Sequence, residues 1–74
     1  MINVPITTEY IKLDQFLKLA NIIGTGGEAR LFIFENDIFV NDEKETRRGR
    51  KLRPNDRVKV LGKEYVITQA GEEK

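Results

Sequence analysis

Hydrophobic and polar residues alternate at the start of the chain. Ile2, Val4 and Ile6 occupy every second position of residues 2–7, which is the period of a β-strand. Pro5 has no N–H to donate to a neighbouring strand, so a central position in a sheet is excluded. The segment is therefore predicted to be an edge strand or an extended arm.

From residue 13 the hydrophobic period lengthens to that of a helix. Apolar residues recur at i, i+3, i+4 and i+7, and the acidic Asp14 stands near the start, where it suits the helix dipole. The helix is expected to fade over residues 21–24, with Gly24 as its stop. The predicted buried stripe consists of Leu13, Phe16, Leu17 and Ala20.

A second helix is predicted to open at residues 25–28. Thr25 can cap its N-terminus, and Glu28 follows at the spacing of a capping box. Asn36 is expected to end the helix in the left-handed conformation, which Asn tolerates better than most residues. The buried stripe of this helix is predicted to be Ala29, Phe32 and Ile33.

The second half of the chain has the pattern of short strands joined by turns. Residues 38–40 alternate and precede Asn41–Asp42, a two-residue hairpin turn after which residues 43–46 would return. A turn is predicted at residues 53–56, where Pro54 presets φ. Residues 57–68 alternate on both sides of a bend at Gly62–Lys63 and are predicted to form a hairpin. Its inward residues would be Val58, Val60, Tyr65 and Ile67.

The order of these elements predicts an α+β fold in which two packed helices lie on a small antiparallel sheet. The 74 residues are expected to form a single domain, 1–74, with its core in 11–68 and a frayed polar tail at 69–74. A chain of this length buries only about 60% of its unfolded surface, so the core should be thin.

The composition argues against an enzyme. The chain has no cysteine, histidine or serine, which removes thiol and serine nucleophiles, the usual general base and the commonest metal ligands. Its acidic residues lie in polar contexts typical of solvated surface carboxylates. We therefore expect no catalytic residue, no metal and no cofactor. No apolar stretch approaches the roughly 20 residues of a membrane span, and no secretory signal is evident, so a cytoplasmic protein is expected.

Charge is distributed unevenly along the chain. Residues 44–59 contain eight basic and two acidic side chains, a net +6, whereas the remaining residues have five basic and ten acidic side chains, a net −5. Five of the basic residues fall within residues 47–53, and four of these are arginine, the residue suited to bidentate phosphate contact. A solubilising loop is the alternative reading, but two acidic neighbours, Glu45 and Asp56, do not neutralise five cations. Aromatic residues are absent from 47–53, which favours recognition of RNA shape and backbone over base stacking.

The glycines before the second helix offer a second candidate contact. Uncovered N–H groups at a helix start attract phosphate, so Thr25, Gly26 and Gly27 could contact an anion or form no more than a flexible turn. The segment lacks the Lys-Ser/Thr ending of a P-loop and the spacing of a dinucleotide fingerprint.

In the order of their predicted helices and strands, residues 11–60 resemble the RNA-binding domain named after small-subunit ribosomal protein four, the S-four domain. The resemblance rests on KLDQFL at 12–17, TGGEAR at 25–30, NDIFVND at 36–42 and PND at 54–56. The domain also occurs in pseudouridine synthases and bacterial tyrosyl-tRNA synthetases, but GGEAR together with ETRRGRKL is more similar to its small stand-alone bacterial members. The resemblance implies a fold of the S-four type and structured RNA as ligand, with ribosomal RNA or ribosomal particles as the expected source.

The chain departs from the family pattern in three respects. Gly26 stands where the family has an arginine, so one usual phosphate contact is missing. Asn36 and Asp42 replace glycines, and the basic stretch at 47–53 is heavier than in most of the family. That stretch is therefore expected to carry more of the binding here.

Our first hypothesis is a non-catalytic RNA-binding protein. Binding would be salt-dependent, and replacing Arg47 and Arg48 with alanine would weaken it without changing which RNA is preferred. The alternative is a protein-interaction adaptor that docks an acidic partner through the same loop, and duplex DNA is a less favoured ligand. The candidate RNA-binding residues are Lys12, Thr25, Gly26, Gly27, Arg30, Arg47, Arg48, Arg50, Lys51 and Arg53, with Lys18 alongside.

Overall fold

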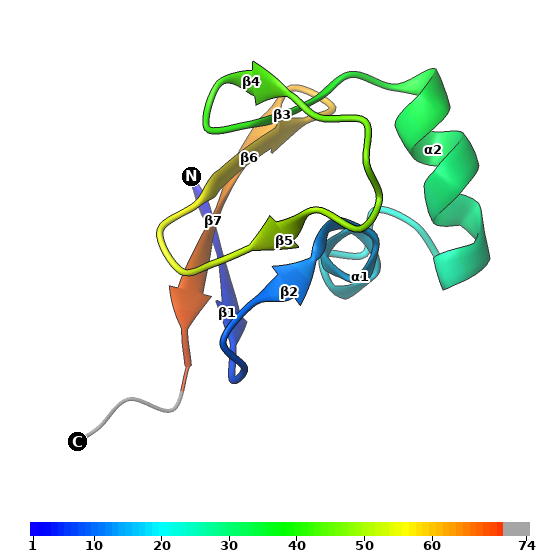
Figure 1. Cartoon of the computed structure of the whole chain (residues 1–74). Coiled ribbons are helices and arrows are strands. Elements are labelled where there is room, and N and C mark those ends of the chain that lie inside the picture. Colours follow the sequence, from blue (N-terminus) through cyan, green and yellow to red (C-terminus); the bar gives the residue numbers. More distant parts are fainter. Residues whose placement is uncertain (71–74) are drawn as a thin grey trace.

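The computed structural model describes residues 1–70, which form two α-helices beside a five-stranded sheet (Figure 1). The strand order in this sheet is β1-β7-β6-β3-β4, and β2 and β5 form a separate two-stranded sheet. The α+β class is confirmed. In chain order the elements are β1 (Ile2–Ile6), β2 (Ile11–Lys12), α1 (Leu13–Leu19), the 3-10 turn η1 (Gly26–Glu28), α2 (Ala29–Glu35), β3 (Ile38–Val40), β4 (Glu43–Lys44), β5 (Lys51–Leu52), β6 (Arg57–Val60) and β7 (Lys63–Gln69).

The larger sheet is mixed and not wholly antiparallel. Strand β1 runs parallel to β7, from Ile2 opposite Tyr65 to Ile6 opposite Gln69, while the other neighbouring strands are antiparallel. Because β1 lies at the edge of the sheet, the edge-strand prediction for this segment is confirmed. The missing N–H of Pro5 is tolerated there.

The chain remains ordered beyond the point where fraying was expected. The Gln69 side-chain amide and the Ala70 N–H both donate to the Ile6 carbonyl, at 3.1 and 2.8 Å. The predicted start of a frayed tail at residue 69 is therefore wrong for these two residues. Residues 71–74 of that prediction lie outside the described residues.

A single hydrophobic core lies between the helices and one face of the sheet. Alternate residues of β3, β6 and β7 are buried. The ring of Phe16 in α1 packs edge to face against the ring of Tyr65 in β7, with 5.4 Å between the ring centres. Both helical stripes face this core as predicted, although Ala20 and Phe32 are only partly buried. Val4 and Ile6 also belong to the core, which therefore begins before residue 11.

Helix α1 ends at Leu19, and the residue that terminates it is Asn21 and not Gly24. Asn21 is left-handed, with φ of 61°, and its N–H donates to the Lys18 carbonyl at 3.0 Å. The Ile22 N–H reaches the Leu17 carbonyl at 2.9 Å, which completes a Schellman motif. Gly24 instead donates its N–H to the Glu28 carboxylate at 2.8 Å.

The predicted caps of the second helix are not formed. Thr25 makes no side-chain capping hydrogen bond, and the Glu28 carboxylate is engaged by Gly24, so the chain enters α2 through η1. Asn36 is extended, with φ of −131°, and not left-handed. Its backbone N–H and its side-chain amide both donate to the Phe32 carbonyl at 3.0 Å, so the Asn36 side chain reinforces the last hydrogen bond of α2.

Left-handed residues set the turns between strands. Asn41 and Asp42, with φ of 51° and 72°, form the predicted hairpin turn between β3 and β4. Asn55, with φ of 81°, follows Pro54 in the predicted turn before β6. The β6–β7 turn is centred on Leu61–Gly62, one residue earlier than predicted. Strand β4 is only two residues long, so the chain leaves the sheet just before the basic stretch.

Candidate nucleic-acid interface

The basic stretch at residues 47–53 lies across the start of α1. The Arg50 and Arg48 carbonyls accept hydrogen bonds from the N–H groups of Leu13 and Asp14, at 2.8 and 2.9 Å. Leu52 is fully buried, and β5 pairs with β2. Because its backbone supplies acceptors for N–H groups at the start of α1, the stretch is fixed to the helix and is not a free loop.

A buried carboxylate, Glu45, organises the beginning of this stretch. Glu45 is 5% exposed and accepts backbone hydrogen bonds from Thr46 and Arg47, at 3.1 and 2.9 Å. Its oxygens also accept from Nε and Nη2 of Arg47, at 2.9 and 3.1 Å. A further contact of 2.7 Å comes from Nη1 of Arg50. Five donors therefore surround one carboxylate, as a buried charge requires.

The same contacts fix the charge of Glu45. The side-chain hydrogen bonds from Arg47 lower the pKa of Glu45 to about 2, against the opposing effect of burial. The backbone N–H of Arg47 and the Arg50 guanidinium act in the same direction. Glu45 in turn raises the pKa of Arg47. Two of the five cations of the stretch are thus engaged internally, and the Arg50 side chain is only 27% exposed.

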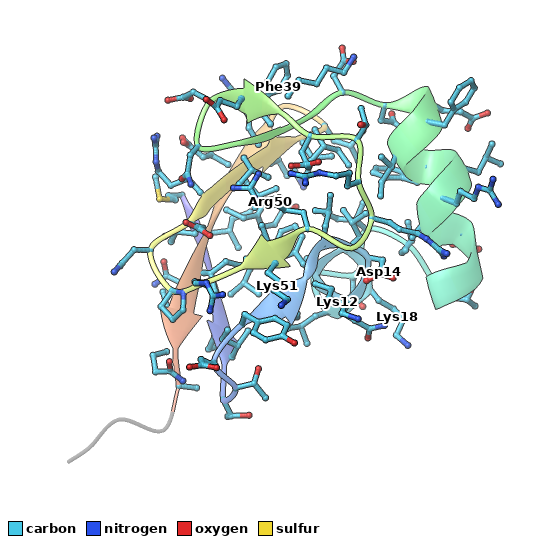
Figure 2. All side chains as sticks on the ribbon, in the orientation of Figure 1. Lys12, Asp14, Lys18, Phe39, Arg50 and Lys51 are labelled. Atoms are coloured by element: carbon cyan, nitrogen blue, oxygen red, sulfur yellow. The ribbon has the colours of Figure 1, made fainter. Side chains whose placement is uncertain are left out.

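The other cations of the stretch point to solvent. Arg48, Lys51 and Arg53 are exposed, and none of them forms a salt bridge within residues 1–70. Lys12 stands directly opposite Lys51 in the β2–β5 pair, so both side chains project from the same face. In Figure 2, Lys12, Lys18 and Lys51 lie near one another beside α1.

Tyr10 supports two of these cations. The Lys51 ammonium lies 4.9 Å from the centre of the Tyr10 ring, and the Arg53 guanidinium carbon lies 5.5 Å from it. Cation–π contacts of this kind hold like charges close together at a gain of about 0.5–1 kcal/mol each. A shallow hollow adjoins them, lined by Arg47, Gly49, Arg50, Lys51, Arg53 and Asp56.

We call Lys12, Arg47, Arg48, Lys51 and Arg53 the basic face. It comprises five of the ten residues predicted from the sequence, all of them exposed. Arg50 lies behind it, bonded to Glu45.

The remaining predicted residues lie at the start of α2. Thr25, Gly26 and Gly27 lead into and begin η1, and Arg30 is an exposed residue of α2. Gly27 and Arg30 line a second hollow with Lys44 and Thr46, on the other side of the segment that leads to Arg47. The sequence-predicted residues therefore occupy two neighbouring sites and not one.

Sequence reasoning missed several residues of these sites. Glu45 was considered only as a charge that offsets the arginines, and Tyr10 was not considered at all. Leu31 and Phe34 of α2 are 59% and 86% exposed beside the second hollow. Their signal was available, because both are large apolar residues that fall off the predicted stripe of Ala29 and Ile33.

Residues 1–70 contain neither an acidic metal-binding cluster nor a membrane-spanning helix. No group of three or more acidic residues is placed to hold a metal ion. Neither helix of this part of the chain has the length and hydrophobicity that crossing a membrane requires.

Comparison with known proteins identifies relatives over most of the chain. The family model described as S4 domain matches residues 4–68. A Bacillus subtilis (strain 168) protein named as a probable ribosome maturation protein, RlbA, is 51% identical to this chain over 59 residues. That alignment spans 80% of this chain and 83% of the relative. Together with the fold and the position of the basic stretch against α1, these matches show that the chain belongs to the S4 domain family.

Proposed function

We propose that this protein is a non-catalytic RNA-binding protein that recognises structured RNA through the basic face. The observation that carries the proposal is the grouping of exposed cations around the start of α1. Arg48, Lys51 and Arg53 form no salt bridge with any carboxylate of residues 1–70. A phosphate backbone is the ligand that such a group of arginine and lysine side chains best complements.

The support beneath these cations favours a rigid contact surface. Glu45 fixes Arg47, Tyr10 lies against Lys51 and Arg53, and the backbone of the stretch is bonded to α1. Cations held in place lose less conformational entropy on binding than mobile ones. We expect the surface to read the spacing of phosphates in a folded RNA and not the sequence of its bases.

Ribosomal RNA is the proposed source of this structured RNA. The relative from Bacillus subtilis is named as a probable ribosome maturation protein, and it aligns with 80% of this chain. We infer that this protein binds ribosomal RNA or ribosomal particles during their assembly. Such a role would place the protein in the cytoplasm.

The N-terminal turn before α2 is proposed as a secondary contact. Thr25 and Gly27 are exposed, and Arg30 extends from the first turn of α2 on the same side as the hollow shared with Lys44. Because Gly26 carries no side chain, we expect this contact to be weaker than that of the basic face. Arg50 is proposed to act mainly through its ion pair with Glu45.

A salt titration of RNA binding tests the proposal. Anisotropy of a labelled stem-loop RNA should give a log–log slope of about −3.5 to −4.5 if the five cations of the basic face each contact a phosphate. Replacing Arg48 and Lys51 with alanine should weaken binding about tenfold and reduce the slope by about 1.4–1.8. The matched control replaces Lys59 and Lys63, two exposed lysines of β6 and β7, and should leave both quantities nearly unchanged.

Two outcomes would overturn the proposal. A slope near zero would remove phosphate contacts as the basis of binding. Equal losses in the two double variants would show that net charge, and not this surface, governs affinity. A duplex DNA of equal length serves as the competitor, and we expect it to bind more weakly than the stem-loop RNA.

A further inference from the structure

Helix α2 exposes two large apolar side chains on the side away from the core. Phe34 is 86% exposed and Leu31 is 59% exposed, whereas Ala29 and Ile33 of the same helix are buried. Figure 1 shows α2 at the periphery of the molecule, beside the chain that leads from β4 to β5. Single exposed apolar residues are common, but these two line one hollow and therefore form a shaped surface.

The hollow beside them combines an apolar wall with cations. Its volume is about 520 Å³, within the range of small-molecule sites. Arg30 of α2 and Lys44 of β4 line it together with the Thr46 hydroxyl, and no acidic residue is among the described residues that line it. Lys44 is paired with Asp37 at 2.9 Å, but both side chains are more than half exposed, so a phosphate can compete for the ammonium.

The hollow lies beside the segment that leads to the basic face. Thr46 immediately precedes Arg47, which lines the other hollow, and Lys44 lies three residues before it, so one short stretch of chain runs between the two hollows. The cations Arg30 and Lys44 and the apolar wall of this hollow complement a nucleotide, whose phosphates are anionic and whose base offers an apolar face.

We propose that the hollow accepts one unpaired base of the bound RNA. The base stacks on the Phe34 ring and against Leu31, and the adjoining phosphates are bound by Arg30 and Lys44. This inference rests on the proposed function and adds to it a preference for RNA that carries an unpaired nucleotide next to a helix. The aromatic contact that residues 47–53 lack is supplied by α2.

Two stem-loop RNAs that differ only by one unpaired 2-aminopurine in the stem test the inference. Wild-type protein should bind the bulged RNA about 5- to 50-fold more tightly than the fully paired one, and the 2-aminopurine fluorescence should fall as the base stacks. Phe34→Ala should abolish the preference and the fluorescence change while altering affinity for the paired RNA less than twofold. Phe34→Tyr should retain both effects.

Two controls distinguish loss of this site from loss of folding and from loss of exposed apolar surface in general. Phe34 is highly exposed, so the melting temperature of Phe34→Ala should match that of the wild type. Leu19→Ala removes a different exposed apolar side chain, at the end of α1, and should leave the preference intact.

The possible failures are distinguishable. Salt-dependent binding of both RNAs with equal affinity, unchanged by Phe34→Ala, would overturn the unpaired-base inference and leave the proposed function standing. Failure of the wild-type protein to bind either RNA would overturn both the unpaired-base inference and the proposed function. Binding of a polyglutamate peptide that Phe34→Ala abolishes, with RNA binding unaffected, would overturn the inference in favour of a protein partner.

Discussion

The two sides of the segment 44–53 differ in how their cations are held. On the side of β2, Lys51 and Arg53 lie against Tyr10, and Arg47 is bonded to Glu45. On the side of α2, Arg30 projects next to Phe34 without a salt bridge among residues 1–70. One side therefore offers charge that is fixed in place, and the other offers an apolar surface with charge at its margin.

From this difference we propose a separate task for each side. Fixed cations suit a regular array of phosphates, because each contact then costs little conformational entropy. An exposed ring suits a base that has left its helix, because every base presents an apolar face. The segment between the two sides depends on Glu45, whose removal should disturb both.

Of the changes considered, loss of Glu45 should have the largest effect, because it lowers stability and weakens RNA binding on both sides of the segment. Glu45→Ala leaves the partly buried Arg50 guanidinium without its partner and should lower the free energy of unfolding by about 3 kcal/mol. A chain of this length has about 4–11 kcal/mol in total, so the variant should be markedly unstable in a urea titration. RNA binding should weaken on both sides, because the segment is no longer held.

Glu43→Ala is the matched control for that change. Glu43 is an exposed carboxylate two residues earlier in β4, and it should alter stability by no more than about 0.5 kcal/mol. Equal destabilisation by the two variants would contradict the role assigned to Glu45.

Acid should remove the contribution of the Glu45 carboxylate to the free energy of unfolding without a mutation. The pKa of Glu45 is about 2 in the folded protein and 4.5 ordinarily, so its stabilisation is complete above pH 4.5 and is lost as the pH falls towards 2. The shift corresponds to as much as about 3 kcal/mol. The stability difference between wild type and Glu45→Gln should therefore narrow over this range, as followed by urea unfolding at a series of pH values. A difference that stays constant down to pH 2 would refute the depressed pKa.

Addition of a cation at Gly26 should make the α2 side more like the basic face. A Cβ atom at Gly26 would have no neighbour within 4 Å, and the residue is not in the left-handed region. Gly26→Arg should therefore fold normally and strengthen binding of paired stem-loop RNA about three- to fivefold, with a salt slope steeper by about 0.7–0.9. Gly26→Gln adds length without charge and should leave the slope unchanged. An unaltered slope in the arginine variant would mean that RNA does not pass this turn.

The smallest expected effect concerns the aromatic support of the basic face. Tyr10→Leu removes the ring beneath Lys51 and Arg53 but retains apolar bulk, so binding of stem-loop RNA should weaken about two- to threefold. Tyr10→Phe keeps the ring and should bind as the wild type does. Equal loss in both variants, measured by anisotropy, would point to the hydroxyl and not to the ring.

Local patterns were sufficient for most of the elements of the fold. Both amphipathic stripes, the edge position of β1 and the Asn41–Asp42 turn follow from periodicity, the missing N–H of proline and the tolerance of Asn and Asp for positive φ. The helix ends were less predictable, because several residues compete for the same role. Asn21 takes the left-handed position expected of Gly24, and Glu28 bonds to Gly24 and not to Thr25.

The candidate site was predictable in composition but not in arrangement. The density of arginine and lysine at 47–53 identifies a cationic stretch from the sequence alone. Which of these side chains turn inward depends on Glu45, whose burial arises from long-range packing that no local pattern reports. The sequence likewise gave no reason to join Lys12 to Lys51, because the β2–β5 pair connects residues about 40 positions apart.

By itself, the sequence determined the α+β class, the cationic stretch and the absence of cysteine, histidine and serine. The tertiary structure alone decided that β1 runs parallel to β7, that Arg50 supports the surface while Arg48 faces solvent, and that Phe34 borders a hollow with Arg30. The reason is physical. Local periodicity encodes which face of an element is apolar, but the choice of neighbours across the chain depends on how those faces pack together in a single core.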